Sequence, residues 1–134
     1  MKTLQIFFLA LALGLMSFNI VSNEDVKTVQ TAPNSSITWK TESLDLGEIP
    51  QGKPVTISFE FQNSGKEAVV IKDAHASCGC TGTEYPKDTI APGKSAVIKA
   101  TFNAANKGGF SKTVTVTTTA DENPKVLTFR GTVI

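Results

Sequence analysis

The chain has 134 residues, with 13 Lys and Arg against 12 Asp and Glu, and its formal net charge is +1. This balance lacks the basic cluster that is typical of nucleic-acid-binding domains. The sequence also has no Lys/Arg-rich amphipathic helix of the kind that binds anionic membranes. Beyond the N-terminal apolar segment, about a hundred residues remain, which is a usual size for a single domain. We therefore expect one domain that binds neither nucleic acid nor, in its mature form, a membrane.

Residues 1–22 have the pattern of a secretory signal peptide, which we expect to be helical. Lys2 precedes an almost wholly apolar stretch, and the first acidic residue is Glu24. A positive start, an apolar run of about 7 to 15 residues and a small residue at the cut define such signals. An uncleaved membrane anchor is the alternative, but the small residues Ser17 and Ser22 favour cleavage after one of them. We expect an exported protein, either periplasmic or secreted.

Residues 23–36 form a polar stretch without helical or strand periodicity, which is typical of a flexible leader. The folded domain is predicted over residues 37–134. One or two short edge strands are expected at its start, around residues 37–39 and 44–46. Trp39 is expected to be an aromatic residue of the core or of a sheet edge.

The middle of the chain alternates between apolar and polar residues, which predicts half-buried strands. The first run covers residues 55–62, the turn residues Asn-Ser-Gly-Lys follow at 63–66, and a second run starts at Val69. We expect these two runs to form a hairpin. Further alternating runs cover residues 96–102, 113–119 and 127–133.

Helical periodicity is nearly absent after residue 22. Short strands spaced roughly 8 to 12 residues apart, with turn residues between them, are typical of a sandwich or a barrel. We predict an all-β immunoglobulin-like β-sandwich of about seven strands.

Ser77–Thr81 reads Ser-Cys-Gly-Cys-Thr and is the one chemically unusual segment, with the only histidine, His75, close by. Cysteines of exported proteins are commonly disulfides, so we expect Cys78 and Cys80 to be oxidised to each other and to shape the turn. Thiolate and imidazole groups also suit Cu(I) or Zn(II), which makes His75, Cys78 and Cys80 a candidate metal site. A strained, redox-active disulfide is the third interpretation, although the Cys-x-x-Cys pattern of oxidoreductases is not met.

Catalytic patterns are absent from the sequence. Ser77 lacks the Gly-x-Ser-x-Gly context of a hydrolase nucleophile. No paired carboxylates and no phosphate-cradling glycine loop stand out. We therefore predict that the protein is not an enzyme and that it uses no cofactor.

Five segments together resemble one bacterial family, the domain of unknown function 1573. The resemblance extends over about residues 44–133, and the Ser-Cys-Gly-Cys-Thr segment is its most specific part. It implies an immunoglobulin-like fold, export, and kinship with binding scaffolds of cilia and centrosomes, but no established activity. We predict a non-catalytic module that binds another envelope or extracellular protein, with metal binding or thiol redox chemistry at Cys78-Gly79-Cys80 as the alternative. The segments are Leu46–Gly52, Phe59–Gly65, Ser77–Thr81, Ala91–Lys94 and Gly109–Lys112.

Overall fold

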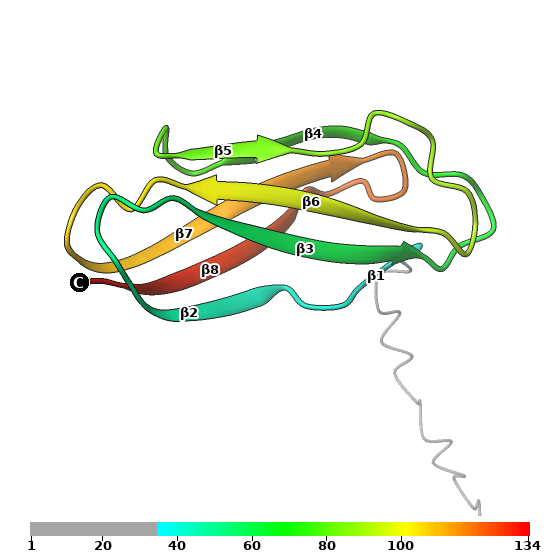
Figure 1. Ribbon diagram of the computed structural model, residues 1–134. Helices are drawn as coiled ribbons and strands as arrows, with labels where there is room; N and C mark the ends of the chain where they lie inside the picture. The colour runs from blue at the N-terminus through cyan, green and yellow to red at the C-terminus, as the bar shows by residue number, and fades with distance from the viewer. Residues whose placement is uncertain (1–34) are drawn as a thin grey trace, which may run out of the picture. The chain divides into compact units, whose positions relative to one another are not determined.

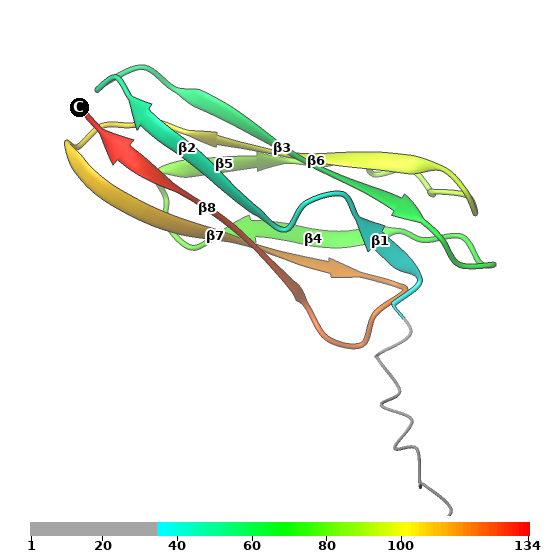
Figure 2. The same ribbon diagram turned by 90° about the horizontal axis from the view of Figure 1, so that it is seen from below.

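The computed structural model describes residues 35–134, and these residues contain eight β-strands. The strands form two four-stranded sheets, with the orders β1-β3-β6-β5 and β2-β8-β7-β4. Figure 1 and Figure 2 show the sheets as two facing layers. The predicted all-β immunoglobulin-like sandwich is therefore confirmed. The strands are β1 (Ile37–Trp39), β2 (Ser43–Ile49), β3 (Val55–Asn63), β4 (Ile71–Ala76), β5 (Thr81–Glu84), β6 (Ser95–Phe102), β7 (Gly108–Thr118) and β8 (Lys125–Val133).

Several sequence-based predictions concern the N-terminal segment. The signal peptide helix, its candidate cleavage positions Ser17 and Ser22, and most of the predicted leader lie outside the described residues. Ser36, at the end of that leader, accepts hydrogen bonds through its carbonyl oxygen from the backbone N–H groups of Ser64 and Gly65. Within residues 35–134, no helix has the length and hydropathy needed to span a bilayer.

The core lies between the sheets and follows the alternation of the sequence. In β3, Ile57, Phe59 and Phe61 are buried, whereas the residues between them face outward. The alternating side chains of β6 and β8 meet them from the same sheet and from the opposite sheet, respectively. Because a strand places successive side chains on opposite faces, this pattern buries one side of each sheet. Ile98 and Phe129 are among the side chains with no exposed surface.

The predicted hairpin between residues 55–62 and 69–71 is wrong. β3 lies in one sheet beside β6, and β4 lies in the other sheet beside β7. The chain between them crosses from one layer to the other, and on the way Val69 forms an isolated bridge with Ile90. Residues 63–66 do change the direction of the chain, as predicted, but they lead it to the other sheet.

Asn63 holds this crossing in place. It is completely buried, and its Nδ2 donates to the carbonyl oxygens of Glu67 at 2.8 Å and Ile90 at 2.9 Å. Its Oδ1 accepts from the backbone N–H of Gly65 at 3.0 Å. A chain that leaves a sheet loses its ladder partners, and buried backbone groups require replacements. One side chain supplies three of them.

We expect Asn63→Ala to lower the free energy of unfolding by about 2–4 kcal/mol, because it removes three hydrogen bonds between a buried side chain and the backbone of the crossing. The measurement is urea-induced unfolding of the full chain. Gln62→Ala is the matched control on the same strand, since Gln62 is exposed and makes one hydrogen bond, from its Nε2 to the Gly93 carbonyl. Equal unfolding midpoints for the two variants would show that the Asn63 network does not stabilise the crossing.

Candidate functional site

Residues 77–80 connect β4 to β5 and therefore also cross between the sheets. The N–H of Ser77 donates to the Thr113 carbonyl at 2.9 Å, which extends the pairing of β4 with β7. The carbonyl of Cys80 accepts from the N–H of Asn103 at 3.1 Å, which extends the pairing of β5 with β6. Each end of the loop is thus fixed to a different sheet, and Cys78 and Gly79 span the gap.

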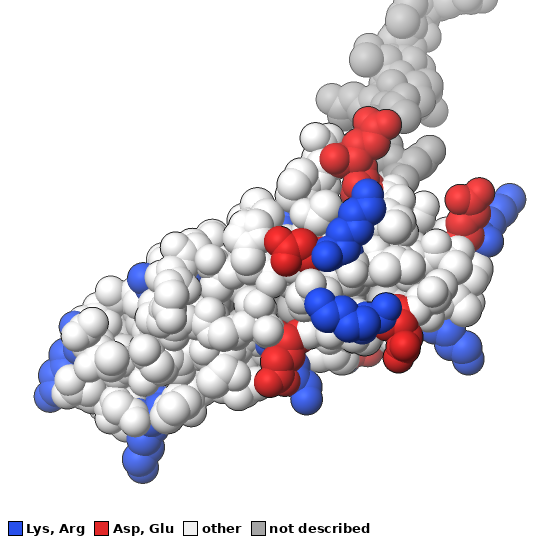
Figure 3. All heavy atoms as spheres, turned by 90° about the horizontal axis from the view of Figure 1, so that it is seen from above, with Lys and Arg blue, Asp and Glu red and all other residues white. Residues whose placement is uncertain are grey.

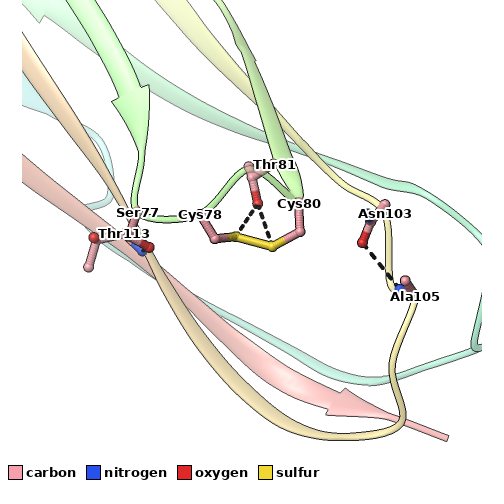
Figure 4. Close-up of a disulfide and its surroundings, with 7 residues drawn as sticks. All are labelled: Ser77, Cys78, Cys80, Thr81, Asn103, Ala105 and Thr113. Atoms are coloured by element: carbon pink, nitrogen blue, oxygen red, sulfur yellow. Dashed lines mark hydrogen bonds between the residues drawn. A yellow bond between two sulfur atoms is a disulfide. The ribbon is translucent and has the colours of Figure 1, made fainter.

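Cys78 and Cys80 are joined in a disulfide, with 5.3 Å between their Cα atoms. The N–H of Thr81 donates to the Cys78 carbonyl at 3.3 Å and closes a turn around the bridge. The Thr81 hydroxyl lies 3.7 Å from Cys78 Sγ and 3.9 Å from Cys80 Sγ. Figure 4 shows the hydroxyl pointing toward the disulfide, with both contacts dashed. Thr81 is only 7% exposed. The disulfide is therefore in contact with the hydroxyl of a buried residue.

His75 takes part in a different contact. It lies on β4 with an exposed side chain, and its Nδ1 is 3.0 Å from Asp73 Oδ2. Within residues 35–134, no group of three His, Cys, Asp or Glu side chains is placed to hold a metal ion. In the oxidised loop the sulfur atoms are bonded to each other rather than present as thiolates. Metal binding by His75, Cys78 and Cys80 requires a reduced loop, and it stays a hypothesis.

A cavity of about 160 Å³ lies beside the disulfide. Cys80 lines it together with the aromatic rings of Phe102 and Phe110, and both lysines of its wall, Lys107 and Lys112, come from the β6–β7 connection and from β7. No acidic residue lines it. The remaining lining residues are Asn103, Ala105, Asn106, Gly108 and Gly109.

Lys112 is a site residue that the sequence analysis missed. In β7, the inward-facing positions continue from Val116 and Val114 to Lys112 and Phe110, in register with inward-facing residues of β8. A lysine at an inward-facing position interrupts the apolar pattern, so the alternation itself contained the signal. Burial of Thr81 had no such signal, because the residues around it read as a polar loop.

Comparison with known protein families assigns almost the whole folded domain to one family. Residues 37–133 match the model of a family described as "Protein of unknown function (DUF1573)". The chain belongs to the DUF1573 family. No curated protein sequence matches it.

Solved structures share the fold of this DUF1573 chain at low sequence identity. A protein of unknown function from Porphyromonas gingivalis W83 superposes with a TM-score of 0.62 at 10% identity, over 72% of this chain and 46% of that one. The PapD-like domain 7 of human CEP192 superposes with a TM-score of 0.58 at 10% identity, over 75% of this chain and 86% of that one. The VesB protease of Vibrio cholerae superposes with a TM-score of 0.58 at 18% identity, over 73% of this chain and 31% of that one. The chain thus spans less than half of the bacterial proteins, and the likeness establishes an immunoglobulin-like and PapD-like fold alone.

We expect the double substitution Cys78→Ser with Cys80→Ser to leave the domain folded and to lower its free energy of unfolding by about 1–2 kcal/mol. A bridge across one residue closes a very short loop, so it removes little entropy from the unfolded chain. Circular dichroism and urea unfolding of the oxidised protein and the variant measure this difference. An unfolded variant would show that the disulfide is essential for the fold.

Proposed function

We propose that this protein is an exported, non-catalytic β-sandwich module of the bacterial envelope that binds another protein by accepting an extended segment along β3. The single observation that carries the proposal is an unpaired stretch of the β3 edge. The signal-peptide pattern of residues 1–22 supports export, and membership of the DUF1573 family is consistent with a non-catalytic module. An exposed strand edge is a template for a further strand.

β1 pairs with only the last three residues of β3, Phe61 to Asn63, and the carbonyl of Glu60 accepts from Lys40 beyond it. The chain then leaves this sheet and continues as β2 in the other one. Asn63 directs both its N–H and its carbonyl to the β6 side, toward Lys94 and Gly93. Backbone groups alternate in direction along a strand.

By this alternation, the backbone groups of Thr56 and Ser58 point away from β6. Among residues 35–134 no strand pairs with them on that side. Two residues therefore offer an N–H and a carbonyl each to an incoming segment. A third residue, Glu60, offers only its N–H, because its carbonyl already accepts a hydrogen bond from the N–H of Lys40.

Apolar side chains are half-buried along the same side of the sandwich. They are Trp39 of β1, Leu44 and Leu46 of β2, and Val55 of β3, and all pack against the core without being fully covered. The indole Nε1 of Trp39 is buried and has no hydrogen-bond partner among the described residues. An extended segment with apolar residues at alternate positions would cover these side chains while its backbone pairs with β3.

The other sheet edges are poorer templates. β2 has a bulge between Asp45 and Glu48, and the Asp45 carboxylate accepts from the N–H of Gly47 at 2.9 Å and from Arg130 Nε at 3.1 Å. These two bonds, the Gly47 bond first, hold the pKa of Asp45 below its usual value and keep a charge on that edge. On the opposite side, the Thr83 hydroxyl donates to the Ala74 carbonyl at 2.6 Å and so occupies a backbone acceptor of β4. Bulges, charges and covered edges all oppose strand addition.

The test compares Ser58→Pro with Ser58→Ala in the full chain. Proline removes the N–H that faces the free edge and leaves the pairing with β6 intact, whereas alanine keeps the N–H and removes only the side chain. We expect immobilised wild-type protein and Ser58→Ala to retain a stoichiometric partner from envelope extract, and Ser58→Pro to lose at least about tenfold in affinity, because it removes one backbone hydrogen bond and blocks approach of the strand. Mass spectrometry identifies the partner, and titration with the purified partner gives the affinities.

Hydrogen exchange supplies the second measurement. The amides of Thr56 and Ser58 are expected to become protected when the partner binds, while amides of β4 stay unchanged. Binding that protects β4 or β5 instead, or equal affinities of Ser58→Pro and wild type, would disprove binding along β3. Reproducible absence of any stoichiometric partner would count against the function itself.

A further inference from the structure

Thr81 is a buried residue whose hydroxyl contacts an acceptor that suits it poorly. Its hydrogen-bond partners among the described residues are Cys78 Sγ and Cys80 Sγ, at 3.7 and 3.9 Å. Neutral sulfur is a weak acceptor. A thiolate is an anion, and hydrogen bonds to ionised acceptors are roughly twice as strong as neutral ones. The hydroxyl of Thr81 therefore stabilises the reduced loop more than the oxidised loop.

The positive charge around the disulfide also favours the reduced loop. The cavity beside Cys80 is lined by two lysines and by no acidic residue, whereas four other cavities within residues 35–134 each have an Asp or Glu in their lining. In Figure 3, Lys and Arg side chains but no Asp or Glu occupy the left-hand end of the face drawn, which is the end that carries the β4–β5 and β6–β7 connections in Figure 1. Neighbouring lysines lower the pKa of cysteine thiols and so stabilise thiolates.

We propose that the Cys78–Cys80 disulfide is a reversible thiol–disulfide exchange site for small thiols that carry a carboxylate or sulfonate group. The cavity of about 160 Å³ accommodates the thiol-bearing end of such a molecule, and Lys107 and Lys112 in its wall attract the anionic group. Phe102 and Phe110 provide apolar contact for the carbon chain. This site lies on the β4–β5 side of the sandwich and does not depend on binding along β3.

The exchange consists of two balanced steps. A substrate thiolate attacks Cys80 Sγ, the sulfur on the cavity side; the Cys78–Cys80 bond breaks, a mixed disulfide with Cys80 forms, and Cys78 leaves as a thiolate. A second substrate thiolate attacks the sulfur of the bound substrate, which releases the substrate disulfide and the Cys80 thiolate. Two substrate thiols are oxidised and the protein disulfide is reduced by two electrons. Thr81 is a positioning residue that donates its hydroxyl hydrogen to the thiolates.

The test measures reduction of the oxidised full chain by three thiols of similar size and different charge: 2-mercaptoethanesulfonate, 2-mercaptoethanol and cysteamine. Alkylation of the released cysteines followed by intact-mass analysis gives each rate, which is divided by the thiolate fraction. We expect the anionic thiol to react about tenfold faster than the cationic one at low salt, and this ratio to shrink at high salt because the lysines are screened.

Charge variants test the role of the cavity. Lys107→Gln with Lys112→Gln is expected to abolish the preference for the anionic thiol, and Lys107→Gln alone, at an exposed position, to reduce it about threefold. Lys94→Gln with Lys99→Gln is the matched control, because both lysines are exposed and neither lines the cavity. Equal rates for the three thiols, an unchanged preference in Lys107→Gln, or a folded protein that these thiols do not reduce would overturn the proposal.

A separate measurement tests the role of Thr81: the equilibrium constant of the Cys78–Cys80 disulfide with reduced and oxidised glutathione. We expect Thr81→Val, which keeps the shape of the side chain, to shift this equilibrium about tenfold toward the protein disulfide, and Thr81→Ser to restore it, because only the hydroxyl donates to the thiolates. A purely structural role would not be restored by serine. Equal equilibrium constants for wild type and Thr81→Val would refute the role of Thr81.

Discussion

The requirement that the rest of the structure depends on is that a chain crossing between two sheets must replace the hydrogen bonds of the strands it leaves. Burial of polar backbone groups is costly unless they are paired. After β3, the side chain of Asn63 supplies these bonds. After β4, the chain crosses within four residues because Ser77 is still bonded to β7 and Cys80 already to Asn103. Both crossings therefore give backbone groups at their ends new partners outside the strand ladders.

The chain crosses between the sheets in different ways on the two lateral sides of the sandwich. On the β4–β5 side, a disulfide and the bond from Thr83 to Ala74 link the two sheets. On the β1–β2 side, β1 ends after three residues, the chain changes sheets, and part of β3 has no neighbouring strand on the side away from β6 among residues 35–134. A closed side favours chemistry on a fixed loop, whereas an open side favours binding of another chain. Because the proposed sites lie on opposite sides, substitutions at one are expected to leave the other unaffected.

Alternation predicted the strands that carry the core, since β3, β6 and β8 each bury every second residue. It did not predict the connections, because a turn sequence such as 63–66 does not specify whether the next strand returns to the same sheet. β5 was missed for a related reason: Thr-Gly-Thr-Glu has little apolar character, and backbone pairing with β6 alone makes it a strand. Of the site, the pairing of Cys78 with Cys80 was among the interpretations offered by the sequence, whereas the contacts of Thr81 depend on tertiary packing.

The stability of the domain does not explain why the disulfide is present. A bridge that spans a single residue stabilises the folded state by only about 1–2 kcal/mol, because it restricts the unfolded chain little. Full burial of one large apolar side chain contributes about 1.5–3 kcal/mol. The core contains many such side chains, including Phe59, Phe61 and Phe129. A loop that needed only shape could use turn residues, as the Asn63 crossing does. Two sulfurs, the hydroxyl of a buried residue and a lysine-lined cavity at one crossing are better explained by chemistry than by stability.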